Sequence, residues 1–79
     1  MSAKTAPAIE TVERLFDEVD EWYQRVHGVR QKLAKLKRGS EAYLDLLSDL
    51  WVEADVLSRK AAQAAEALDE FQESLRDAD

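Results

Sequence analysis

The feature that most constrains this chain is a pair of apolar runs whose spacing alternates between three and four residues without a break. This is the period of an α-helix that turns one face toward a neighbour. We therefore expect two helices, over about 9–37 and 41–76. The first run consists of Val12, Leu15, Val19, Trp22, Val26, Val29, Leu33 and Leu36. The second consists of Tyr43, Leu47, Leu50, Ala54, Leu57, Ala61, Ala64, Leu68, Phe71 and Leu75.

The short segment 38–40 separates the two runs. Gly39 suits the left-handed conformation that follows a helix C-terminus, and Ser40 suits the N-cap of the next helix. A connection this short forces the two helices to run antiparallel. The sequence therefore predicts an all-α fold, an antiparallel two-helix hairpin. We expect residues 1–8 to be a flexible N-terminal segment and residues 9–79 to be a single helical-hairpin domain.

Folding about the turn also predicts a register between the helices. Leu36 should meet Tyr43, and Leu33 should meet Leu47. The basic segment 25–38, which contains six Lys and Arg residues and no acid, should lie beside the acidic segment 41–55. Further expected layers are Val29–Leu50, Val26–Ala54, Trp22–Leu57, Val19–Ala61, Leu15–Ala64 and Val12–Leu68. Expected charge contacts are Arg25 with Glu53 and Arg30 with Trp51.

Each helix carries an additional apolar row beside its predicted seam. A two-helix contact covers one line on each helix, so this second row would stay in water. Exposed apolar patches of this kind mark interaction surfaces. We expect the chain to dimerise into a four-helix bundle, or else an unidentified protein to supply the missing helices. The predicted interface residues are Ile9, Phe16, Tyr23, Leu44 and Trp51.

The net charge of −6 is concentrated at the end away from the turn. Two such ends repel each other, so the sequence favours a head-to-tail antiparallel homodimer. The same end is a candidate docking surface for a basic partner. Its predicted residues are Asp17, Asp20, Glu21, Asp69, Glu70 and Glu73.

Composition removes several classes of function. The chain has no cysteine and one histidine, His27, so it offers no disulfide, no metal cluster and no histidine-based nucleophile pair. No glycine-rich phosphate loop is present. We therefore expect a non-enzyme without catalytic, cofactor or metal residues. The acidic balance argues against nucleic acid as a partner. No apolar run reaches the roughly 20 residues of a membrane span, and we expect a cytoplasmic protein.

These observations predict a non-catalytic protein-binding hairpin, such as an adaptor, a small chaperone, an assembly factor or an inhibitor. It would act through an apolar helix face and an acidic tip. One alternative is an acidic inhibitor that imitates nucleic acid and occupies a basic groove, as phage-type antagonists do. A second alternative is a small RNA- or DNA-binding hairpin dimer that uses the basic segment 25–38.

Overall fold

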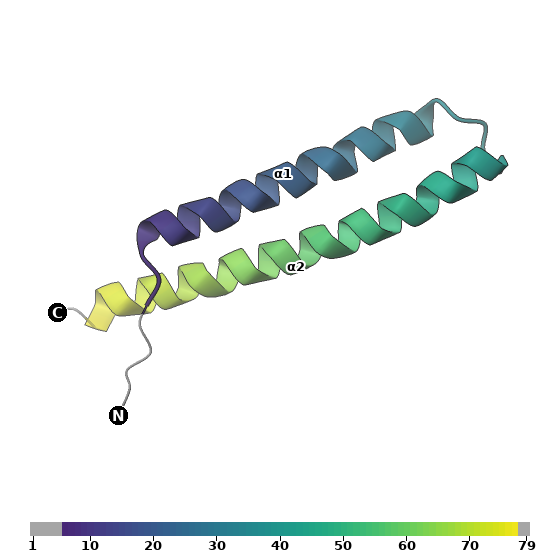
Figure 1. The fold of residues 1–79 in the computed structure, drawn as a ribbon. Helices are drawn as coiled ribbons and strands as arrows, with labels where there is room; N and C mark the ends of the chain where they lie inside the picture. Colours follow the sequence, from purple (N-terminus) through teal and green to yellow (C-terminus); the bar gives the residue numbers. More distant parts are fainter. Residues whose placement is uncertain (1–5, 78–79) are drawn as a thin grey trace.

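The computed structural model describes residues 6–77, and it confirms the predicted all-α helical hairpin. Helix α1 spans Ile9–Ala34 and helix α2 spans Glu41–Asp77. The two helices lie antiparallel and side by side, with the start of α1 and the end of α2 at the end opposite the turn (Figure 1). The hairpin measures 59 × 21 × 14 Å. Of the predicted flexible segment, residues 1–5 lie outside the described part, and residues 6–8 lead into α1 without regular structure.

Helix α1 ends at Ala34, so the expected boundary near residue 37 is wrong. The N–H groups of Lys35 and Leu36 donate to the carbonyls of Lys32 and Leu33, both at 3.1 Å. These bonds span three residues instead of four, which tightens the last turn and takes the chain out of the helix. The connection to α2 is therefore longer than expected.

The turn itself confirms the roles expected of its glycine and serine, with one difference of position. Gly39 has a φ of 83°, in the left-handed region. It lies in a tight turn closed by the Ser40 N–H and the Lys37 carbonyl at 3.1 Å, and does not directly follow α1. The Ser40 hydroxyl accepts a hydrogen bond from the N–H of Tyr43 at 3.2 Å, so Ser40 caps α2.

The predicted inner face of α1 is confirmed. Every residue of the first apolar run is buried or half-buried, and Val12 is only 2% exposed. On α2, Ala64 is completely buried and Ala67 is nearly so. Small residues of α2 therefore fill the seam near the open end.

The predicted inner face of α2 is half wrong. One of its two columns does face α1: Tyr43, Leu50, Leu57, Ala64 and Phe71 are buried or half-buried. The other column is exposed: Leu47, Ala54, Ala61, Leu68 and Leu75. Its place in the seam is taken by residues one position earlier: Leu46, Glu53, Lys60, Ala67 and Ser74. The layers expected for Leu33, Val26, Val19 and Val12 paired these residues with that exposed column, and they stay predictions.

Two cross-helix ion pairs explain why charged residues take seam positions on α2. Lys60 Nζ donates to Glu18 Oε1 at 2.8 Å. Arg25 Nη1 lies 4.0 Å from Glu53 Oε1, which confirms the expected Arg25–Glu53 contact. In each pair the cation meets a carboxylate of the other helix at the edge of the seam.

Candidate functional site

The ion pairs mark one side of the hairpin, which we call the ion-pair flank: Glu18, Arg25, Glu53 and Lys60. A helix turns about 100° per residue, so a residue two positions away lies on nearly the opposite side. Phe16 and Tyr23 stand two positions before Glu18 and Arg25, and Trp51 stands two positions before Glu53.

The exposed apolar residues of both helices therefore gather on the other side of the hairpin. We call this side the apolar flank. Its large members are Ile9, Phe16 and Tyr23 on α1, and Leu44, Leu47, Trp51, Leu68 and Leu75 on α2, and all are exposed. Ala54, Ala61 and Ala65 of α2 lie between them and are also exposed.

Several side chains of this flank are more than half exposed. Trp51 is 70% exposed, Leu75 58% and Leu44 55%. Burying such a side chain stabilises a protein by about 1.5–3 kcal/mol. The structure therefore places all five predicted interface residues in water and on one side of the hairpin. It also adds Leu47, Leu68 and Leu75, which the sequence assigned to the inner face.

Helix α2 thus has two apolar stripes, one facing α1 and one facing solvent. The second stripe follows the same alternation of three and four as the first, and it runs nearly the length of the helix. Its members are Leu44, Leu47, Trp51, Ala54, Ser58, Ala61, Ala65, Leu68, Gln72 and Leu75. This complete spacing is the sequence signal that identifies Leu47, Leu68 and Leu75 as members of the exposed surface.

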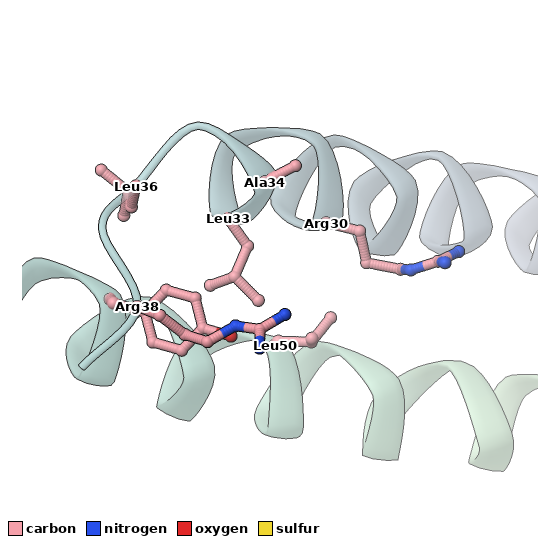
Figure 2. A pocket seen from close by; sticks show the side chains of 7 residues that line it. Arg30, Leu33, Ala34, Leu36, Arg38 and Leu50 are labelled. Atoms are coloured by element: carbon pink, nitrogen blue, oxygen red, sulfur yellow. The ribbon is translucent and has the colours of Figure 1, made fainter. Parts of the chain in front are cut away.

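A hollow of about 300 Å³ lies at the turn end of the hairpin. Leu33, Ala34, Leu36 and Leu50 give it apolar walls, and Arg30 and Arg38 add guanidinium groups. Figure 2 shows Leu33 pointing from α1 toward α2, and Arg38 extending along α2 toward Leu50. Arg30 continues the row of Phe16 and Tyr23, so the hollow lies next to the apolar flank.

The cation–aromatic contact in the described part of the chain differs from the expected one. The Arg25 guanidinium lies 4.5 Å from the centre of the Trp22 ring, whereas the expected partners were Arg30 and Trp51. Arg25 therefore bridges Trp22 and Glu53 on the ion-pair flank. Trp51 stays exposed on the other side.

The predicted acidic docking residues all lie on the half of the hairpin away from the turn, but on different sides of it. By helical position, Asp17 and Glu21 lie on the outer side of α1, and Asp69 and Glu73 lie on the outer side of α2. Asp20 lies beside the apolar flank, and Glu70 lies toward the ion-pair flank. All are exposed except Glu70, which is half-buried. The structure therefore surrounds this end with negative charge and does not form a single acidic face.

The hydrogen bond and charge of Lys60 lower the pKa of Glu18, as an ordinary ion pair does. His27 stacks on Tyr23 with ring centres 6.3 Å apart, in an exposed position beside the apolar flank. Within residues 6–77, no group of three or more His, Asp or Glu side chains is placed to hold a metal ion.

Among the described residues, neither helix contains a stretch long and apolar enough to span a membrane.

Comparison with known proteins identifies no relative: no protein-family model, no curated protein and no solved structure matches the chain. The apolar flank is therefore assigned from its own geometry and chemistry.

Proposed function

We propose that this protein is a non-catalytic binding module that docks its apolar flank onto helices of another polypeptide. The observation that carries the proposal is the exposed stripe of α2, in which Trp51, Leu44 and Leu75 are each more than half exposed. A stripe that repeats at alternating three and four residues is the pattern with which a helix packs against a second neighbour. One helix with two such stripes is the arrangement found inside helix bundles.

The docked state is a helix bundle in which α2 has one neighbour on each stripe. Its first neighbour is α1 of the same hairpin. Its second neighbour comes from the partner, and a partner that supplies two helices completes a four-helix bundle. Adaptors, small chaperones, assembly factors and inhibitors all work through docking of this kind.

The apolar flank favours this function over an acidic imitation of nucleic acid. A nucleic-acid mimic presents carboxylates to a basic groove, and its binding weakens steeply as salt rises. The large exposed apolar side chains here gather on one flank, and the acidic side chains surround one end instead of forming a row. We therefore expect partner binding to change little with salt.

The test is position-specific photo-crosslinking in the cells that produce the protein. A photoreactive phenylalanine analogue replaces either Trp51, on the apolar flank, or Val52, the next residue. Val52 is 54% exposed and lies about 100° further around α2, outside the stripe. The two positions are thus neighbours on one helix, and both side chains are more than half exposed.

We expect a discrete covalent adduct from position 51 and none from position 52. The adduct should persist when the reaction is repeated in lysate at high salt. Equal labelling at both positions, or no adduct at position 51, would contradict docking through this flank. An adduct that disappears at high salt would favour the acidic mimic.

A further inference from the structure

We infer that the occupant of the apolar flank is a second copy of this chain, related to the first by a two-fold axis perpendicular to the helices. This inference rests on the proposed docking function and names its partner. Along α2, the axis is level with the midpoint between Arg59 and Lys60. Along α1, it is level with the midpoint between Val19 and Asp20. The two copies of α2 then lie antiparallel to each other, and so do the two copies of α1.

The first argument is the symmetry of the exposed α2 stripe. A two-fold interface brings the same surface of both copies together, so that surface must be complementary to its own reversed image. Read outward from the midpoint between Arg59 and Lys60, the stripe nearly repeats itself in both directions. The residues that match are Ser58 with Ala61, Ala54 with Ala65, Trp51 with Leu68, and Leu44 with Leu75. The match of Leu47 with Gln72 is the exception.

The sizes of the matched residues also suit an antiparallel pair. The four central positions are small, which allows two helix backbones to approach closely. The large residues lie on both sides of this centre. Trp51 of one copy would therefore pack on Leu68 of the other, and each end of the contact would bring two leucines together.

The second argument comes independently from α1. Its exposed row contains two aromatic residues, Phe16 and Tyr23, and their midpoint falls between Val19 and Asp20. Reversal about this midpoint places Phe16 of one copy against Tyr23 of the other, and Ile9 against Arg30. Aromatic pairs of this kind are worth about 0.5–1.5 kcal/mol beyond the area they bury.

The structure of the hairpin shows that the two midpoints lie at the same height. The ion pair between Glu18 and Lys60 places these residues beside each other, with Lys60 Nζ 2.8 Å from Glu18 Oε1. The midpoint of the α1 pattern follows Glu18 by one to two residues, and the midpoint of the α2 pattern immediately precedes Lys60. Because the helices run antiparallel, the two midpoints are level to within about one residue. A single axis therefore satisfies both helices.

The charge distribution supports the same orientation. Reversal places the acidic open end of one copy beside the turn of the other, which carries Lys35, Lys37 and Arg38. The hollow at the turn, with Arg30 at its edge, then faces Ile9 of the second copy and the neighbouring carboxylates Glu10 and Glu13. A parallel arrangement would bring two acidic ends together.

The available area is sufficient for a stable dimer. At about 1.5 Å per residue, the stripe from Leu44 to Leu75 is about 47 Å long. The hairpin is 21 Å wide. The face is thus of the order of 1,000 Å², against about 800 Å² buried per partner in a typical specific interface.

The test uses two single-cysteine variants of this cysteine-free chain, Ala54→Cys and Ala65→Cys. In the proposed dimer, position 54 faces position 65 of the other copy. Two copies of the same position lie about 16 Å apart along the helix direction. This is beyond the reach of a disulfide, which needs Cα atoms about 4.4–6.8 Å apart. Each purified variant is oxidised mildly, alone and as a re-equilibrated mixture of both, and covalent dimer is measured on a denaturing gel.

We expect covalent dimer from the mixture and only background from either variant alone. The native mass of the wild-type protein, measured by light scattering, should be twice its 9.0 kDa chain mass. Disulfide formation by a single variant as readily as by the mixture would overturn the antiparallel two-fold arrangement. A wild-type protein that is monomeric by light scattering would overturn the inference that the partner is a second copy of this chain. A monomeric protein could still form a covalent adduct from position 51 in cells, with a mass that shows a different protein as the partner. In that case the proposed docking function would stand, and only self-association would be overturned.

Discussion

Lys60 of α2 reaches across the hairpin and donates a 2.8 Å hydrogen bond to the carboxylate of Glu18 on α1. Each side chain keeps about a third of its surface exposed, with 33% for Lys60 and 34% for Glu18. The pair therefore stays in contact with water at the edge of the seam. It links the two helices midway along the seam, with Lys60 in the α2 stripe that faces α1.

This ion pair predicts a specific pH dependence of stability. The Lys60 hydrogen bond and charge hold the pKa of Glu18 below its ordinary value of 4.5. A carboxyl whose pKa is lowered by folding contributes stability above the unfolded pKa, and that contribution is lost as the pH falls through the folded pKa. Glu18→Gln should therefore be less stable than wild type at pH 7, and the difference should shrink below about pH 4.5. Urea unfolding at a series of pH values checks this, and a difference that stays constant down to pH 2 would refute it.

The two glycines provide a matched pair of predictions with opposite signs. Gly28 lies within α1, and a Cβ added there meets nothing within 4 Å. Gly28→Ala should therefore stabilise the protein by roughly 0.5–1 kcal/mol through helix propensity. Gly39 has a φ of 83°, so Gly39→Ala should destabilise by about 1–2 kcal/mol. Thermal or urea unfolding measures both, and effects of the same sign would be incompatible with this turn.

Close packing at the open end predicts that enlarging Ala64 is harmful. Ala64 has 0% of its surface exposed, between the two helices. Ala64→Leu should lower the free energy of unfolding by about 1–3 kcal/mol because the seam has no room for the added atoms. Gln63→Leu, at the exposed neighbouring position, is the control and should change it by less than about 0.5 kcal/mol. Equal unfolding midpoints for the two variants would mean that the helices do not approach closely here.

The sequence alone predicted the hairpin, the inner face of α1, the serine cap and the Arg25–Glu53 contact. It failed on half of the α2 inner face, for a physical reason. Helix α2 has two apolar stripes side by side, and an apolar pattern does not say which one faces α1. The prediction joined one column of each stripe and excluded Glu53 and Lys60 from the seam because they are charged, although each meets an opposite charge on α1.

The end of α1 was also misplaced by the sequence. Residues 35–38 contain good helix formers and basic charge, which favour a helix C-terminus near Gly39. The structure instead uses Gly39 to make the turn before α2, and it leaves the helix after Ala34. The five residues proposed for the interface came from the rows left over after one seam was assigned, and the structure leaves all five exposed. The exposed column from Leu47 to Leu75 was not among them.

The most direct test of the account is the native mass of wild type, Trp51→Glu and Val52→Glu by sedimentation equilibrium over a range of concentrations. Trp51→Glu buries a charge in the proposed interface of each copy, so it should weaken the dimer at least about a hundredfold. Val52→Glu alters a neighbouring apolar residue that is also more than half exposed but lies outside the stripe. We predict about twice the 9.0 kDa chain mass for wild type and Val52→Glu, and the chain mass for Trp51→Glu with its helical circular dichroism retained. A wild-type monomer at every concentration, or equal weakening by both substitutions, would contradict association through the apolar flank.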